Sequence, residues 1–164
     1  MDWTKQIGRY FLVMLLQVLL FDQLQLVGTC HPYIYVLCLL MMPITLPHSV
    51  DMIIGAIIGL IMDIFCNSIG IHMAACVGLM FIRPYFLGSI INDKDRLNEQ
   101  ISIHAIGWEA MLKYVIVLVL IHHFIVFTLA AWSWKYMGFV LIETLISSII
   151  STFVILFYNA LKYK

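Results

Sequence analysis

Long runs of apolar residues, separated by short polar stretches, dominate the chain and predict membrane-spanning helices. A helix needs about 20 residues to cross the roughly 30 Å hydrocarbon layer of a bilayer. The predicted spans cover residues 7–26, 33–46, 50–65, 71–91, 114–134 and 138–158. The pattern therefore predicts an all-α integral membrane protein, in which residues 1–164 form one domain of six transmembrane helices.

Two segments depart from a simple span. The run 33–46 is short for a crossing, contains Pro43 and is followed directly by Pro47, so we expect a kinked or tilted second helix. Residues 101–112 place apolar side chains at helical spacing opposite polar ones, which predicts a short helix lying in the membrane interface. The hydrophilic stretch 92–100 is expected in water before that helix.

The composition excludes a soluble globular domain. Hydrophobic residues make up 63% of the chain, charged residues make up 11%, and the mean hydropathy is +1.02. Soluble domains contain about 25% charged residues. Nine Lys and Arg residues balance nine Asp and Glu residues, so no overall positive field favours nucleic acid as a partner.

The basic residues are divided unevenly between the two predicted sides of the membrane. Seven of them fall on one side: Lys5, Arg9, Lys94, Arg96, Lys113, Lys162 and Lys164. Lys135 alone falls on the other side, and Arg83 lies within a span. Because Lys and Arg are enriched in cytoplasmic loops, this distribution predicts that both termini face the cytoplasm.

Small and acidic residues recur every four positions along the third span. Gly55, Gly59 and Asp63 share a broad helix face, and the glycine pair forms a GxxxG motif that lets another helix approach closely. Two interpretations stay open: the motif packs the third span against the fourth, or it forms a surface for another protein. The turn after this span contains Asn67 and Gly70, which are both suited to a positive φ.

Three acidic side chains lie in the same half of the predicted bilayer. Embedded carboxylates are costly and are therefore candidates for cation or proton relay. A structural interpretation is also available: Asp63 caps the turn that follows it, and Asp22 reaches interfacial water. Glu143 lies about 8 Å below the end of the sixth span, at 1.5 Å per residue, and is the deepest of the three.

The Arg83-Pro84 pair interrupts the fourth span. Arg83 lies about 18 Å from the outer start of that span. Its guanidinium can snorkel toward the cytoplasmic headgroups, or it can bind the Met80 carbonyl that Pro84 leaves without a donor. A role in binding a partner or substrate is the alternative.

The histidines and cysteines form no recognisable catalytic or metal-binding signature. The adjacent His122 and His123 point about 100° apart on a helix and cannot converge on one metal. His72, at the start of the fourth span, is the one histidine close to an acid, Asp63, and a hydrogen-bonding role is expected for it. The four cysteines show no CxxC spacing and behave as small apolar residues. We expect no enzymatic activity, metal or cofactor.

The central part of the chain resembles the rod shape-determining MreD family. The resemblance rests on Gly55, Gly59, Asp63, Asn67-Ser68, Gly70, His72 and the pair Arg83-Pro84. The chain length, the six apolar runs and the short N-terminal tail also match the family. His72 and Arg83-Pro84 correspond to the version found in Bacteroidetes-type members.

The resemblance implies a function in cell elongation. It implies a non-enzymatic scaffold of the bacterial inner membrane that binds the bitopic protein MreC and acts with actin-like MreB and the peptidoglycan synthase pair in lateral wall growth. It also implies a helix bundle similar to the S components of vitamin transporters. The alternative function is that of a substrate-binding subunit of a transporter, which binds a small, vitamin-type molecule. A second copy of the chain, forming a homodimer, stays open as a further partner.

Overall fold

The computed structural model describes residues 3–21, 30–90, 101 and 103–162. The regular elements in these ranges are helices, listed here in chain order: α1 (Trp3–Leu16), the π-helix η1 (Gln17–Phe21), α2 (Val36–Leu40), α3 (His48–Cys66), α4 (Ile71–Ile90), α5 (Ile103–Ile106), α6 (Trp108–Ala131), the 3-10 helix η3 (Trp134–Tyr136) and α7 (Met137–Lys162). The predicted all-α class is confirmed for these ranges.

Four of the described helices are long and apolar enough to cross a membrane, which indicates a membrane protein. They are α3, α4, α6 and the continuous stretch from η3 through α7. Residues Ile7–Phe21 of α1 and η1 form a shorter apolar helix. The predicted spans 50–65, 71–91 and 138–158 correspond closely to α3, α4 and α7, whereas the first span ends in residues 22–26, which lie outside the described part.

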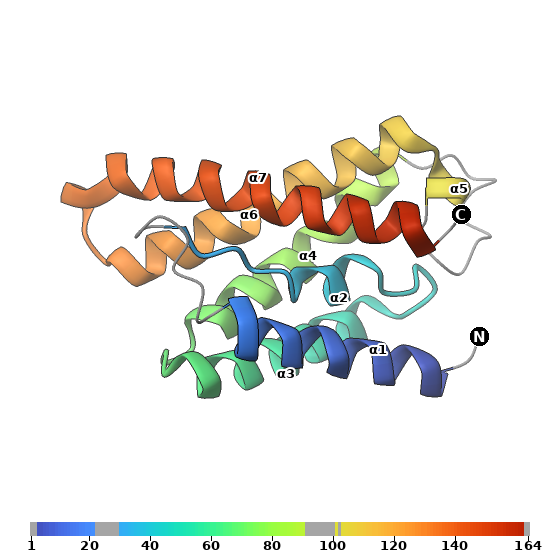
Figure 1. The fold of residues 1–164 in the computed structure, drawn as a ribbon, viewed down its shortest axis with the longest axis horizontal. Coiled ribbons are helices and arrows are strands. Elements are labelled where there is room, and N and C mark those ends of the chain that lie inside the picture. The colour runs from blue at the N-terminus through green and yellow to red at the C-terminus, as the bar shows by residue number, and fades with distance from the viewer. Residues whose placement is uncertain (1–2, 22–29, 91–100, 102, 163–164) are drawn as a thin grey trace.

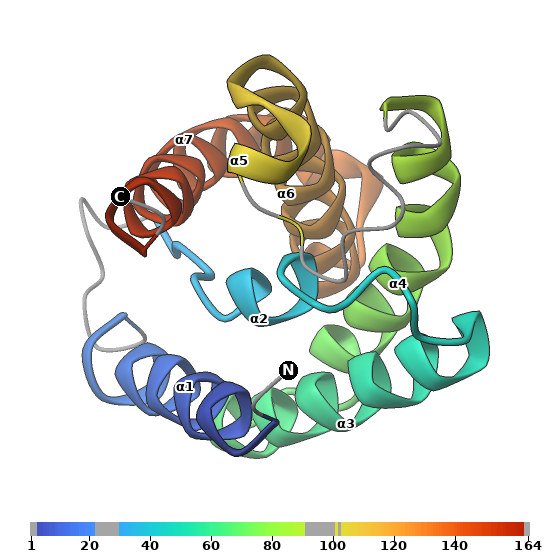
Figure 2. The same ribbon diagram turned by 90° about the vertical axis from the view of Figure 1, so that its right-hand side faces the viewer.

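The predicted second helix is wrong. In the run 33–46 only the five residues of α2 are helical, because Pro43 lacks the N–H that a continuing helix needs and Pro47 adds a second interruption. Residues 30–46, which we call the central segment, lie inside the ring formed by α1, α3, α4, α6 and α7 (Figure 2). The side chains from Tyr35 to Leu40 are almost completely buried.

The prediction of a single short helix over residues 101–112 is also wrong. Gly107 has a φ of +82°, a conformation that glycine adopts easily, and it separates the single-turn helix α5 from α6. Trp108 therefore begins a long helix that continues to Ala131 and ends at Trp132, whose φ is +44°. The apolar and polar positions near residue 108 belong to the first turns of a candidate span.

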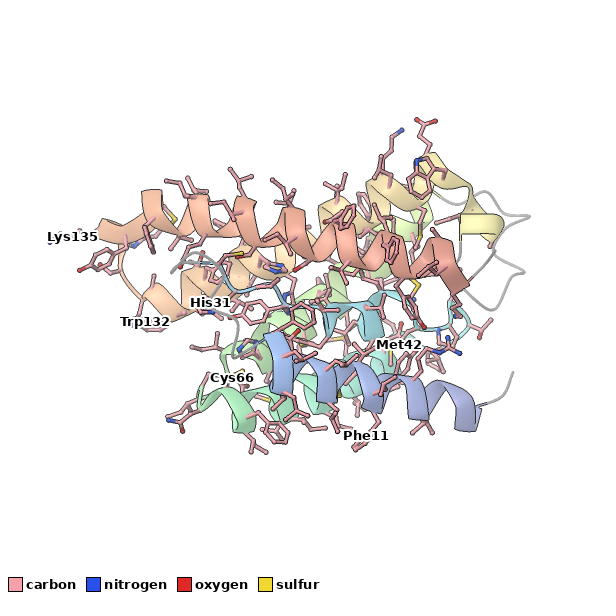
Figure 3. All side chains as sticks on the ribbon, in the orientation of Figure 1. Phe11, His31, Met42, Cys66, Trp132 and Lys135 are labelled. Atoms are coloured by element: carbon pink, nitrogen blue, oxygen red, sulfur yellow. The ribbon has the colours of Figure 1, made fainter. Side chains whose placement is uncertain are left out.

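The beginning of α1 and the end of α7 lie at the same end of the molecule (Figure 1). His31, Cys66, Trp132 and Lys135 lie at the opposite end, whereas Met42 lies toward the termini (Figure 3). We call these the Trp132 end and the terminal end. The central segment therefore runs alongside the long helices from the Trp132 end to the terminal end. Three basic residues used in the topology prediction, Lys94, Arg96 and Lys164, lie outside the described residues, and so does the acidic residue Asp22.

The GxxxG motif packs α3 against α4 inside the protein. A Cβ atom on Gly59 would lie 2.5 Å from the Cα of Met73, and one on Gly55 would lie 2.8 Å from the Cγ of Met80. Both distances are too short for any residue larger than glycine without movement of the neighbours. Of the two interpretations of this motif, the structure supports internal helix packing.

Candidate functional site

The backbone of the central segment receives its hydrogen bonds from buried polar side chains of the surrounding helices. A segment without regular structure leaves N–H and C=O groups unpaired, and at membrane depth such groups must find partners within the protein. The helices supply these partners at both ends of the segment. This set of side chains forms the candidate functional site.

Gln17 provides the first group of contacts, near the Trp132 end. Its Oε1 accepts hydrogen bonds from the N–H groups of Ile34 (2.6 Å) and Tyr35 (3.3 Å), and its Nε2 donates to the carbonyl of Pro32 (3.2 Å). Gln17 is buried and is the first residue of the π-helix η1. The wider π-helical turn therefore begins at the residue that forms these hydrogen bonds. One amide side chain therefore holds three backbone groups on the N-terminal side of α2.

His123 and Ser147 hold the segment from the other side. Nε2 of His123 accepts from the N–H of Tyr33 at 3.3 Å, and its Nδ1 lies 2.9 Å from the carbonyl of Val119. Since a carbonyl can only accept, Nδ1 carries the proton and the imidazole is neutral. Oγ of Ser147 accepts from the N–H of His31 at 3.1 Å. Residues of α6 and α7 thus fix the first part of the segment.

At the terminal end, the segment is held by Arg83 and Tyr114. Nη2 of Arg83 donates to the carbonyl of Met42, and the hydroxyl of Tyr114 donates to the carbonyl of Leu40 at 2.8 Å. Nε of Arg83 donates to the Tyr114 oxygen at 3.0 Å. The Arg83 side chain is 1% exposed and forms an ion pair with Asp51, with Nη1 2.9 Å from Oδ2.

Arg83 therefore does not snorkel, and the carbonyl it binds is that of Met42 and not that of Met80. The predicted interruption at Pro84 is wrong, because α4 continues through Pro84 to Ile90. The sequence analysis did not identify Asp51 as the partner of Arg83. The signal was available: in an antiparallel pair joined by a turn at residues 67–70, Asp51 and Arg83 lie at depths that differ by about one helical turn.

Asp63 caps the N-terminus of α4. Its Oδ1 accepts from the N–H of His72 (2.9 Å) and the hydroxyl of Ser68 (2.7 Å), and its Oδ2 accepts from the N–H of Met73 (3.0 Å). The carboxylate thus satisfies helix N–H groups that have no partner within α4, and its charge complements the helix dipole. Asn67 (φ +51°) and Gly70 (φ +76°) form the turn. The predicted capping role and positive φ values are confirmed.

His72 and His122 meet on the hydroxyl of Tyr35. Nδ1 of His72 lies 3.0 Å from this oxygen, and Nε2 of His122 lies 2.8 Å from it. The hydrogen-bonding role predicted for His72 is confirmed, but its side-chain partner is Tyr35, because only its backbone N–H reaches Asp63. His122 and His123 bind different groups, as their positions on a helix predict. Among the described residues, no three His, Cys, Asp or Glu side chains are arranged to hold a metal ion.

A cavity of about 380 Å³ opens at the Trp132 end. Its polar lining includes His31, Tyr33, Cys66, Ser68 and His72. His72 connects this cavity to Tyr35 and His122 in the interior. Glu143 is half-buried on α7, close enough to His31 for an electrostatic interaction, and it does not line the cavity.

The structure divides the eight predicted site residues into groups. Five of them belong to the contact between α3 and α4 and to the turn that joins these helices: Gly55, Gly59, Asp63, Gly70 and His72. Arg83 and Pro84 lie near the terminal end. Glu143 lies on α7, apart from both groups. Sequence reasoning missed Gln17, Tyr35, Tyr114, His123 and Ser147, although each is a polar residue within or beside an apolar run.

No family model, curated protein or solved structure matches the chain.

Proposed function

We propose that the protein is a non-enzymatic scaffold of the bacterial cell-elongation machinery, similar in role to the MreD family. One observation carries the proposal: the buried polar side chains bind the chain's own backbone. Gln17, His123, Tyr114 and Arg83 hold the central segment, and Asp63 caps α4. Because these groups stabilise the fold, the apolar outer faces of the helices are left for contact with lipid and with other membrane proteins.

In this proposal the chain crosses the inner membrane six times, and the central segment makes the second crossing. A crossing without a continuous helix is tolerated where protein surrounds it. The common location of the α1 start and the α7 end supports an even number of crossings (Figure 1). The excess of basic residues on one predicted side of the membrane supports a cytoplasmic location for both termini.

The outer faces of α1, α3 and α7 offer the contact surfaces for MreC. Large apolar side chains are exposed along each of them, exemplified by Phe11 on α1, Ile57 on α3 and Phe153 on α7. MreC would present its single membrane helix to one of these faces, while MreB and the synthase pair would join through the same assembly. A second copy of the chain would compete for the same faces.

Site-specific photo-crosslinking tests this proposal. A photoreactive residue replaces Phe11, Ile57 or Phe153 in turn, and buried Leu39 serves as the matched control. The expected result is a crosslink to MreC from one outer face and none from position 39. If no outer position captures MreC, and depletion of the protein leaves rod-shaped cells unchanged, the scaffold proposal is wrong.

The cavity at the Trp132 end favours a second candidate, a small-molecule transporter subunit resembling an S component. At about 380 Å³ the cavity is within the range of ligand sites, and polar groups converge on it. A subunit of this kind would bind a vitamin-type compound from outside the cell. Equilibrium binding to a vitamin panel distinguishes the two functions, since saturable binding lost in Tyr33→Ala supports transport and its absence supports the scaffold.

A further inference from the structure

A second cavity, of about 190 Å³, lies near the terminal end between the start of α3 and the last turns of α4. Its lining includes Leu46, His48, Asp51, Arg83 and Leu87. Two buried polar atoms among these described residues have no hydrogen-bond partner: Oδ1 of Asp51 and Nε2 of His48. A buried polar atom without a partner destabilises the fold, so this cavity has the character of a binding site.

The chemistry of the cavity is fixed by the ion pair. Arg83 holds Oδ2 of Asp51 at 2.9 Å, which leaves Oδ1 as an acceptor for a positively charged donor. The three hydrogen bonds of Arg83 engage three of the five N–H donors of a guanidinium. His48 packs its ring against Phe81 and Tyr85 at 5.7 and 6.1 Å, and its Nε2 can donate or accept according to the tautomer.

These groups match a zwitterion better than a simple ion. Asp51 and Arg83 carry opposite charges, so the pair gives the cavity no net charge that would attract a lone anion or cation. A ligand with both charges can place an ammonium on Oδ1 of Asp51 and a phosphate oxygen toward Arg83 and His48. The ammonium must carry N–H groups, because Oδ1 can only accept.

The depth of the cavity matches the boundary between headgroups and acyl chains. Asp51 lies about 5 Å from the start of α3, and Arg83 lies about 10 Å from the end of α4, at 1.5 Å per residue. Both helices are candidate spans, so their ends lie near the polar surface of the bilayer. Leu46 and Leu87 give the same cavity an apolar wall, which suits the part of a lipid below its headgroup.

We propose that this cavity binds the headgroup of a phospholipid that carries a primary ammonium, phosphatidylethanolamine, from the cytoplasmic leaflet. The ammonium donates to Oδ1 of Asp51, and the phosphate accepts from His48 and Arg83. The proposal goes beyond the scaffold function and applies equally to a transporter subunit. It requires the orientation of the membrane described above, but no particular partner.

Native mass spectrometry and thermal unfolding of the full-length protein in detergent test this site. The added probes are phosphatidylethanolamine, phosphatidylcholine of the same acyl chains, and soluble phosphoethanolamine. We expect saturable binding of phosphatidylethanolamine, with an affinity about tenfold higher than that of phosphatidylcholine, whose trimethylammonium has no N–H. Soluble phosphoethanolamine is expected to bind far more weakly, because it lacks the apolar part that contacts Leu46 and Leu87.

Variants identify the groups responsible. Asp51→Asn is expected to lose the preference for the primary ammonium, and His48→Ala is expected to weaken phosphatidylethanolamine binding several-fold. His48→Ala leaves the ion pair intact, so it tests the site in a folded protein even if Asp51→Asn fails to fold. Glu109→Gln, at the same end and outside the cavity, is the control and should bind like the native protein.

Three outcomes would overturn the proposal. Equal binding of the two lipids by the native protein, or unchanged binding by His48→Ala, would show that the cavity does not recognise the headgroup. Binding of soluble phosphoethanolamine as tightly as the lipid would show a site for a free metabolite. None of these outcomes bears on crosslinking to MreC, so this proposal and the scaffold proposal fail separately.

Discussion

Arg83 and Asp51 form a buried ion pair, with Nη1 2.9 Å from Oδ2, that joins α4 to α3 beside the carbonyl of Met42. The pair does more than neutralise two charges, because Arg83 also binds Tyr114 and thereby connects α6 to the same network. Three helices are in this way attached to the end of a segment that lacks continuous helical hydrogen bonds. The stability of the pair and the position of the central segment therefore depend on each other.

The first prediction concerns loss of one partner of this pair. Asp51→Leu leaves the buried guanidinium without a counter-charge, and we expect it to lower the free energy of unfolding by about 3–5 kcal/mol. The double variant Asp51→Leu/Arg83→Met removes both charges and should be less destabilised than Asp51→Leu alone. Denaturant unfolding in detergent micelles measures both.

The exposed pair of Lys113 and Glu109 provides the matched control. Its atoms are also close, with Nζ 2.7 Å from Oε1, but both side chains are largely exposed. Lys113→Met should leave stability unchanged, because water screens such a pair. If Asp51→Leu is as stable as Lys113→Met, the ion pair does not stabilise the fold.

The second prediction concerns the contact between α3 and α4. Gly59→Ala places a Cβ 2.5 Å from the Cα of Met73, so the helices must separate, and we expect a loss of about 1–3 kcal/mol. Gly78→Ala is the control, since its Cβ would lie 3.4 Å from a side-chain methyl of Ile125 and both substitutions add the same methyl group to a helix. Equal unfolding midpoints for the two variants would contradict the close packing.

The long helices could be predicted because neighbouring residues in the sequence are sufficient to stabilise each of them. Each of the runs 50–65, 71–91 and 138–158 is apolar over its whole length, and a helix satisfies its backbone without outside partners. The run 33–46 is equally apolar, but its conformation depends on Gln17 and on residues of α6 and α7 that are distant in sequence. The hydropathy of a segment indicates that it avoids water. It does not indicate which side chains will form hydrogen bonds with the backbone of that segment.

The distinction between local contacts and contacts distant in sequence also explains which part of the candidate site could be predicted and which part could not. The contact of Asp63 with the N-terminus of α4 spans nine residues in sequence, so the turn itself pointed to it. Arg83 and Asp51 are 32 residues apart, and only their matching depth in two antiparallel helices would have suggested a pair. Tyr35 and His122, 87 residues apart, had no such signal.

The third prediction concerns the Gln17 amide. Gln17→Met keeps the length of the side chain and removes the groups that bind Pro32, Ile34 and Tyr35. Several buried backbone groups then lose their partner, at about 1–3 kcal/mol each, and we expect hydrogen exchange of the Ile34 and Tyr35 amides to accelerate. Leu16→Met, at the preceding partly exposed position, should leave both amides protected. Unchanged protection in Gln17→Met would contradict this role.

The fourth prediction concerns the cap at Asp63. Asp63→Asn keeps one oxygen for the N–H of His72 or Met73, whereas Asp63→Ala keeps none. The expected order of stability is Asp, then Asn, then Ala, with about 0.5–2 kcal/mol lost for a missing cap. Thermal unfolding of the three proteins gives the order. A cation or proton relay function would instead predict that Asp63→Asn folds normally and no longer relays the cation or proton.

The last prediction concerns the orientation of the two ends in the membrane. Lys135 lies at the Trp132 end (Figure 3), and the exposed Lys113 lies near the start of α6, toward the terminal end. In a background with Cys66 replaced by Ser, a membrane-impermeant maleimide added to intact cells should label Lys135→Cys and not Lys113→Cys. After the cells are opened, both should be labelled, because both side chains are exposed. Labelling of Lys113→Cys alone in intact cells would show that the orientation is the reverse of the predicted one. The proposed phosphatidylethanolamine site would then lie in the outer leaflet.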